Sequence, residues 1–214
     1  MKIEDICQGL RGRLAGRCRK IQNETDYFSA AVVLPLVPQG EELGILFEVR
    51  SPKLTWQPGE ICFPGGRIEA AESPGQAALR ETCEELRIMP QGLAFLGPLD
   101  YLVSPIGVIL YPYVGYIAEP QKIRPNNGEV AEIFTVPLRF LLENDPFVAE
   151  MEVATRPLPG FPLEHMPPGY PSGWRSRASY PVYFYRYQGR VIWGITARVL
   201  NDFILLCRDL LAGE

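Results

Sequence analysis

Two apolar stretches in the first quarter of the chain predict a pair of neighbouring strands. Residues 30–37 form a run of aliphatic side chains around one proline, and a proline- and glycine-containing turn at 38–40 ends the run. In residues 44–50 the side chains alternate, with Ile45, Phe47 and Val49 on one side and Leu46, Glu48 and Arg50 on the other. A short apolar run, a turn and a strand with two-residue periodicity are typical of a β-hairpin, so we expect these segments to pair.

The rest of the chain carries short strand signals and two strong helix signals. Turn-forming residues bracket a strand at 61–63, and Ser73-Pro74 begins a helix that Pro90 ends. Apolar residues at helical spacing predict a C-terminal helix over 196–211. Further strands are expected at 93–102, 108–117, 133–136, 183–187 and 190–193, and the prolines and glycines between 156 and 181 predict a long loop between hairpin strands. This order of elements predicts an α+β fold.

The first 28 residues are expected to form a helical extension of a domain that spans residues 29–214. Apolar residues recur there at helical spacing, at Ile3, Ile6, Cys7, Leu10 and Leu14. Cations surround them, at Arg11, Arg13, Arg17, Arg19 and Lys20. We interpret the segment as an amphipathic helix packed on the domain, with a basic face for an anionic substrate or a membrane surface as the alternative.

Composition narrows the class of protein. The 214 residues are 47% hydrophobic and 21% charged, which is ordinary for a globular domain and unlike a disordered or fibrous chain. The net charge of -4 gives no basic excess to attract nucleic acid, so an anionic substrate must be held by local cations or a metal. No segment reaches the ~18 apolar residues of a membrane span, and the N-terminus lacks the apolar run of a signal peptide. We therefore expect a small-molecule substrate, no nucleic-acid or membrane partner, and an oligomeric state that stays open to a homodimer.

The cysteines indicate a reducing compartment. Their positions are scattered, at Cys7, Cys18, Cys62, Cys83 and Cys207, with no close pair. An odd number of separated cysteines is typical of free thiols, so a cytoplasmic location is expected.

Three glutamates on the central helix are the main candidates for chemistry. Glu81, Glu84 and Glu85 are spaced i, i+3 and i+4, which places them on one arc of the helix at about 100° per residue. The opposing side, which we expect to pack on the core, carries Leu79, Thr82, Cys83 and Leu86. Like charges at this spacing repel, and a hard divalent cation such as Mg²⁺ or Mn²⁺ would offset the repulsion through carboxylate oxygens. A solvated acidic face is the alternative interpretation.

The glutamates belong to a longer pattern. Gly66 is followed after five residues by Glu72 and after seven more by Arg80-Glu81, and then come Thr82, Cys83, Glu84-Glu85, Leu86, Arg87 and Ile88. This order and spacing resemble the Nudix box. The resemblance implies a Nudix-type α/β/α sandwich with a mixed sheet, and a hydrolase that cleaves diphosphate linkages.

The same resemblance implies roles for individual residues. Glu81, Glu84, Glu85 and the Gly65 carbonyl would hold Mg²⁺ or Mn²⁺, while Glu72 and Arg80 would tie the loop to the helix and orient the ligands. Two positions depart from the family pattern: Thr82 replaces an aliphatic residue, and Arg87 replaces a glycine. Because glycine tolerates a left-handed conformation better than arginine, we expect a modified helix end with an intact site.

Segments around the box resemble the coenzyme A diphosphatase branch of the family. They are residues 46–51, 59–66 and 193–203. The branch usually has an arginine where Thr55 stands and a histidine where Trp56-Gln57 lies. The resemblance implies hydrolysis of coenzyme A or acyl-coenzyme A to 3′,5′-ADP and (acyl-)4′-phosphopantetheine. The nearest cations for its phosphates are Arg50, Lys53 and Arg67, with ordinary surface charge as the alternative for each.

Several choices stay open at this point. The general base is Glu84, Glu129 or Glu132, and we expect catalytic roles for Glu81, Glu84, Arg80 and Glu129. His165 is expected on a surface loop with no catalytic role. Four aromatic residues would either pack in the fold or stack on adenine and shape a pantetheine channel: Trp174, Tyr180, Tyr183 and Tyr185. The alternative substrates are ADP-ribose, NADH and dinucleoside polyphosphates, and the alternative function is a non-catalytic nucleotide-binding module.

Overall fold

The computed structural model of the chain describes residues 3–18 and 21–211. Its α-helices are α1 (Ile3–Leu14), α2 (Pro74–Leu86), α3 (Leu138–Glu143) and α4 (Gly194–Leu211), and short 3-10 helices lie at Glu24–Asp26, Pro90–Gly92, Pro120–Lys122 and Leu163–His165. Its strands are β1 (Phe28–Gln39), β2 (Glu42–Arg50), β3 (Ile61–Cys62), β4 (Gly65–Arg67), β5 (Ala94–Pro98), β6 (Leu102–Ser104), β7 (Val108–Tyr116), β8 (Val130–Pro137), β9 (Phe147–Thr155), β10 (Arg175–Tyr187) and β11 (Arg190–Trp193). None of these helices is long and apolar enough to cross a membrane.

The larger sheet is mixed and is built around β1. Its order is β3-β2-β1-β7-β5, with β4, β6 and β8 pairing with β1, β7 and β2. β1 and β7 run parallel, whereas the other pairs are antiparallel. The predicted hairpin between the first two strands is confirmed, because Gln39 pairs with Glu42 and Gly40 adopts the positive φ of +69° that the tight turn requires.

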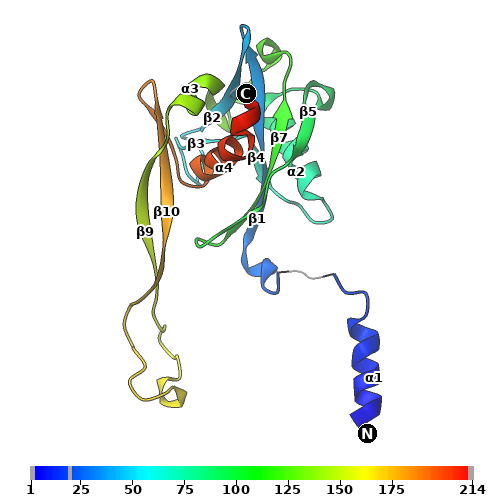
Figure 1. Cartoon of the computed structure of the whole chain (residues 1–214), viewed down its shortest axis with the longest axis vertical. Helices are drawn as coiled ribbons and strands as arrows, with labels where there is room; N and C mark the ends of the chain where they lie inside the picture. Colours follow the sequence, from blue (N-terminus) through cyan, green and yellow to red (C-terminus); the bar gives the residue numbers. More distant parts are fainter. Residues whose placement is uncertain (1–2, 19–20, 212–214) are drawn as a thin grey trace.

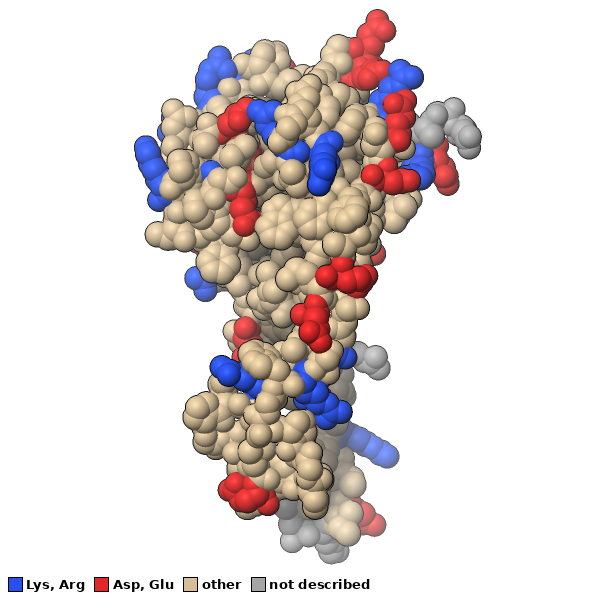
Figure 2. All heavy atoms as spheres, turned by 90° about the vertical axis from the view of Figure 1, so that its left-hand side faces the viewer, with Lys and Arg blue, Asp and Glu red and all other residues tan. Residues whose placement is uncertain are grey.

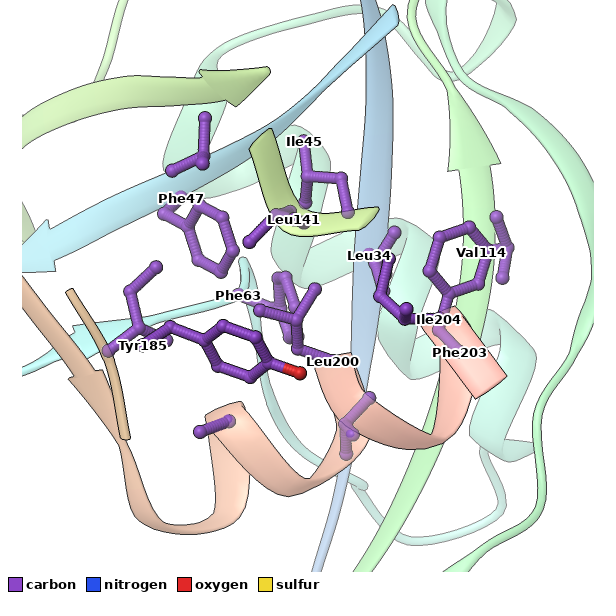
Figure 3. Packing of buried hydrophobic residues seen from close by; sticks show 14 of the residues in the cluster. Leu34, Ile45, Phe47, Phe63, Val114, Leu141, Tyr185, Leu200, Phe203 and Ile204 are labelled. Carbon is purple, nitrogen blue, oxygen red and sulfur yellow. The ribbon is translucent and has the colours of Figure 1, made fainter. Parts of the chain in front are cut away.

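Helices cover both faces of this sheet, so the predicted α/β/α sandwich is confirmed (Figure 1). On one face, Ala77, Ala78 and Leu86 of α2 pack against apolar side chains of β1 and β2. On the other face, α3 and α4 pack against the opposite side chains of the same strands. Figure 3 shows this second layer, in which Leu200, Phe203 and Ile204 of α4 lie among Leu34, Ile45 and Phe47 of β1 and β2.

The double covering buries both sides of the central strands. Leu46 and Glu48, on the second side of β2, are 2% and 1% exposed. The alternation in residues 44–50 therefore separates two buried faces, one against α2 and one against α4, and Glu48 is a carboxylate inside the protein.

The predicted strand at 93–102 is two strands, β5 and β6, which pair with opposite ends of β7. Pro112 lies between these two pairing regions and has no amide hydrogen to donate, which favours a break in the ladder at this point.

A second sheet, of order β11-β10-β9, forms an arm (Figure 1). Here the sequence-based boundaries are wrong: β9 was not expected, and β10 begins at Arg175 within the predicted loop of residues 156–181. Pairing with β9 explains why the polar first half of β10 is extended, because it supplies the ladder of hydrogen bonds that this segment cannot obtain from core burial. Figure 2 looks onto this arm and shows a narrow projection whose surface is mostly uncharged.

The N-terminal helix forms as predicted, but the prediction that it packs on the domain is wrong. Residues 3–14 are all exposed, including Ile3 at 78% and Leu14 at 58%, and Figure 1 shows α1 standing away from both sheets. No residue of α1 is buried, so the helix has no core contact that would hold it. Arg19 and Lys20 of the expected basic face, residues 1–2 of the expected extension and residues 212–214 of the expected domain lie outside the described residues.

Candidate metal and active site

Local sequence signals position the central helix. The Gln76 amide donates to the Ser73 hydroxyl at 3.4 Å, and the Ser73 amide donates to the Gln76 side chain at 2.9 Å, which makes a capping box at the start of α2. Pro74 occupies the first turn, where a missing amide hydrogen costs nothing. The helix begins at the predicted residue.

The other end of α2 differs from the expectation of a modified helix end. Arg87 adopts the left-handed conformation with φ 50° and ψ 48°, as a glycine would, and its amide donates to the Cys83 carbonyl. Its guanidinium donates to the Asn126 side-chain oxygen at 3.1 Å. The helix therefore ends in the conformation expected for a glycine, and the left-handed Arg87 backbone is strained.

Two glycines bring the preceding loop against the helix. Gly65 has φ +146°, and a Cβ there would meet the Ala31 carbonyl and lie 2.5 Å from the Val32 Cα. A Cβ on Gly66 would lie 2.5 Å from the Glu81 carboxyl carbon. Only residues without a side chain let this backbone approach the carboxylates so closely.

Arg80 links the loop and the acidic side chains. Its Nε and Nη2 donate to the two oxygens of Glu72 at 3.0 Å each, and Nη1 donates to Glu81 at 2.8 Å and to Glu84 at 3.5 Å. Nη2 also donates to the Arg67 carbonyl at 3.2 Å. The bonds from Arg80 lower the pKa of the Glu72 carboxyl, and the bond to Glu72 raises the pKa of the Arg80 guanidinium, so both groups are charged near neutrality.

The three box glutamates lie in different environments. Glu84 is exposed, with 56% of its side chain accessible to solvent, and Glu81 is partly buried, with 21% of its side chain accessible. Glu85 is buried, with 5% of the residue accessible. Glu85 lies on the packing side of α2 beside Leu86, so the prediction of fully separate packing and chemical faces is wrong. The Gly65 amide donates to its Oε2 at 2.8 Å, which gives the buried carboxylate a polar partner.

Partial burial raises the pKa of the Glu81 carboxyl; bonds from Arg80 oppose this shift, and the negative charges of Glu84 and Glu129 add to it. Burial also raises the pKa of Glu85 well above its ordinary range, and the charge of Glu48 contributes. Burial therefore disfavours the charged forms of these carboxyls, and a bound cation would stabilise them.

Glu48 is a site residue that the sequence did not single out. Its side chain lies beside Glu85, and burial raises its pKa to about 7. The Cys62 thiol donates to its Oε1 at 3.4 Å, and burial raises the pKa of that thiol, which keeps it protonated. The available signal was a lone acid within an apolar strand, a position where unpaired charges are rare.

The other candidates for catalysis divide between the two faces of the sheet. Glu129 lies near the box, because its charge raises the pKa of both Glu48 and Glu81, and Asn126 donates to its Oε2 at 3.1 Å. Glu132 pairs across the ladder with Val49, so it lies on the α4 face, and Arg190 donates to its carboxylate. The interpretation of Glu132 as a general base is therefore not supported by its position.

The candidate cations have different surroundings. Arg50 is close enough to the acids to lower the pKa of Glu48 and Glu85, and its Nε donates to the Trp56 carbonyl at 3.3 Å. Lys53 is exposed on the loop that follows β2. Arg67 stacks its guanidinium over the Phe28 ring and borders a hollow of 240 Å³, which Glu24, Thr25, Tyr27, Ser29 and Ile68 also line.

The four candidate aromatic residues lie on the second sheet or at its tip. Tyr185 is 3% exposed, its ring points into the α4 layer in Figure 3, and its hydroxyl donates to Asn201 at 3.3 Å. Tyr183 lies under the Arg198 guanidinium, and Tyr180 donates to the Met151 sulfur at 3.6 Å. Trp174 is 68% exposed and lies under Arg156. Tyr185 is thus a packing residue, and His165 is exposed as expected.

The donor set fits a hard divalent cation. Carboxylate oxygens are the ligands that Mg²⁺ and Mn²⁺ prefer, and the Glu48 Oε2 is buried without a hydrogen-bond partner among the described residues. Within residues 3–18 and 21–211, no three acidic, cysteine or histidine side chains already converge on one point. Glu81 and Glu84 each accept from Arg80 through one carboxylate oxygen, which leaves the other oxygen of each for an ion.

Comparison with known proteins decides the family. Residues 26–155 match the family model described as NUDIX domain. The chain belongs to the Nudix family. The pattern from Gly66 to Ile88 is therefore its Nudix box, and the protein is a Nudix hydrolase, a class that acts on small nucleotide-derived substrates with divalent metal ions.

Its relatives cover different shares of the chain. An uncharacterized Nudix hydrolase, NudL of Pectobacterium atrosepticum, is 32% identical over 181 residues, which are 84% of this chain and 83% of that protein. The peroxisomal coenzyme A diphosphatase NUDT7 of Mus musculus is 37% identical over 113 residues, which are 52% of this chain and 48% of that protein. The match thus spans about half of the mouse protein. The crystal structure of the Nudix hydrolase RenU from M. smegmatis aligns with a TM-score of 0.46 at 25% identity, covering 54% of this chain and 74% of RenU.

Proposed function

We propose that this Nudix hydrolase cleaves the diphosphate of coenzyme A or acyl-coenzyme A, releasing 3′,5′-ADP and (acyl-)4′-phosphopantetheine. The observation that carries the substrate assignment is the 37% identity to a protein named as a coenzyme A diphosphatase. The resemblance of residues 46–51, 59–66 and 193–203 to the same branch supports it.

In this proposal, Glu81, Glu84, Glu85 and the Gly65 carbonyl would hold Mg²⁺ or Mn²⁺. Such an ion would supply Lewis-acid activation of water and neutralise charge on the diphosphate. Arg80 acts as a positioning residue: its paired bonds to Glu72 fix the guanidinium, which in turn fixes Glu81 and Glu84. The Gly65 amide performs the same task for Glu85.

The cations around the acidic site are the proposed phosphate-binding residues. Arg50 lies close enough to affect the buried acids, so it is suited to a phosphoryl group held beside them. Lys53 and Arg67 are the candidates for the more distant 3′-phosphate, because both are exposed on segments that flank the site. Arg67 also borders the hollow beside β4.

The proposed proton acceptor is a carboxylate at the edge of the site. Glu129 is exposed on the loop before β8, and its charge reaches both Glu48 and Glu81. Glu84 is the other candidate, since it is exposed and adjoins Glu81 through Arg80. Exposure leaves either group free to meet a water beside the substrate.

A substrate panel tests the assignment. Purified protein with Mg²⁺ or Mn²⁺ is incubated with coenzyme A, acyl-coenzyme A, ADP-ribose, NADH and dinucleoside polyphosphates, and products are resolved by chromatography. We expect 3′,5′-ADP from the coenzyme A compounds, at rates abolished in Glu81→Gln and Glu85→Gln but not in Glu152→Gln, an exposed strand acid on β9. Cleavage of ADP-ribose or NADH alone contradicts the coenzyme A assignment, and no cleavage of any compound indicates a non-catalytic binding module.

The proposed setting is the cytoplasm. All five cysteines are free thiols, which agrees with a reducing compartment.

A further inference from the structure

The buried acid on β2 has one oxygen occupied and one free. Glu48 is 1% exposed, and the Cys62 thiol occupies its Oε1. No amide, hydroxyl, thiol or cationic group of the described residues donates a hydrogen bond to its Oε2 atom. A buried carboxylate oxygen that accepts no hydrogen bond costs free energy. Its position therefore suggests a bound ligand or another compensating interaction.

The fold directs this side chain toward the box helix. Glu48 pairs with Ile133 across the ladder, and Ile133 and Leu46 both pack in the cluster that α2 covers. Glu85 lies on the buried side of α2 and is within hydrogen-bonding reach of Glu48. The sheet and the helix thus each contribute one buried acid to the same place.

No cationic side chain of the described residues forms an ion pair with these two acids. The charge of Arg50 lowers the pKa of both acids, but its Nε donates to the Trp56 carbonyl, and no hydrogen bond joins it to either carboxylate among the described residues. The Gly65 amide satisfies only one oxygen of Glu85. Two facing carboxylates and a free oxygen, beside a glycine loop, form an oxygen-rich place that matches the preference of a hard divalent cation.

We propose that Glu48 is an additional metal ligand, supplied by the sheet opposite the helix glutamates and oriented by the Cys62 thiol. This inference rests on the proposed metal site of the Nudix box. It adds a ligand from outside the box, so that an ion beside Glu85 is held from two elements of the fold.

Titration with Mn²⁺ tests the proposal without any substrate. Free Mn²⁺ is measured from its electron paramagnetic resonance signal as protein is added, for the wild type and Glu48→Gln. Glutamine keeps the shape of the side chain and removes its charge, so we expect binding weaker by at least ~10-fold, the scale seen when supporting groups of metal sites are lost. Thermal unfolding without metal should show Glu48→Gln at least as stable as the wild type, because a buried acid is removed.

Matched variants separate the possible outcomes. Glu152→Gln, at an exposed acid on β9, should bind Mn²⁺ like the wild type. If Glu48→Gln does not fold, Glu48→Asp retains the charge on a shorter side chain and should also weaken binding. Wild-type affinity in the folded Glu48 variant, together with weakened binding in Glu81→Gln, overturns the role of Glu48 and leaves the proposed function standing. Absence of Mn²⁺ binding by the wild type overturns both.

Discussion

Adding one methyl group at Gly66 should disturb the site while sparing the fold. The new Cβ of Gly66→Ala would lie 2.5 Å from the Glu81 carboxyl carbon, whereas non-bonded carbons rest roughly 3.5–4.0 Å apart. The carboxylate must therefore retreat by about 1 Å, a displacement that can cost about 100-fold in rate when it affects catalytic geometry. The clashing atoms lie at the end of the flexible Glu81 side chain, so the clash is relieved without movement of the backbone. We therefore expect the free energy of unfolding to change by at most about 1 kcal/mol.

The assay compares three quantities: Mn²⁺ affinity, the rate of coenzyme A hydrolysis, and thermal unfolding without metal. Gly97→Ala on β5 is the matched control, because a Cβ there meets nothing within 4 Å. We expect the control to resemble the wild type in all three. Wild-type affinity and rate in Gly66→Ala would refute the assignment of Glu81, since the displaced carboxylate would then be dispensable.

Three further substitutions test the loop, the helix end and the guanidinium. Gly65→Ala should lower the free energy of unfolding by at least ~2 kcal/mol in urea denaturation, because its Cβ meets backbone and its φ is positive; a stable variant contradicts the loop geometry. Arg87→Gly should raise it by about 0.5 kcal/mol, since relief of left-handed strain exceeds the loss of the exposed bond to Asn126, whereas Arg87→Ala should lower it; the reverse ranking would refute the strain. A lysine at position 80 has one nitrogen and cannot donate to both oxygens of Glu72, so Arg80→Lys should weaken Mn²⁺ binding by about 10-fold in the same titration. Unchanged affinity would contradict the positioning role of Arg80.

Local signals in the sequence were sufficient for the box helix and the first hairpin. Ser73-Pro74 caps a helix through contacts within one turn, and the turn at Gly40 needs only its own backbone freedom. The fixed spacing from Gly66 to Glu85 was sufficient to predict the family and the sandwich. These features depend on few residues far away in the chain.

Features that depend on distant partners were missed. The first half of β10 reads as a loop because its residues are polar and include Pro181, and only the pairing with β9 makes it a strand. In the sequence, Glu48 has the alternating position of a side chain that points outward from a strand. The sequence does not show that α2 covers that side of β2. Glu132 lies near Glu129 in sequence, yet strand periodicity and Arg190 place it on the α4 face.

The most direct test of the metal site is an anomalous difference map from crystals soaked in Mn²⁺. The account predicts a peak between the Gly65 loop and α2, within coordination distance of carboxylate oxygens of Glu81 and Glu85. A map with no peak there, or with the ion bound elsewhere, would contradict it.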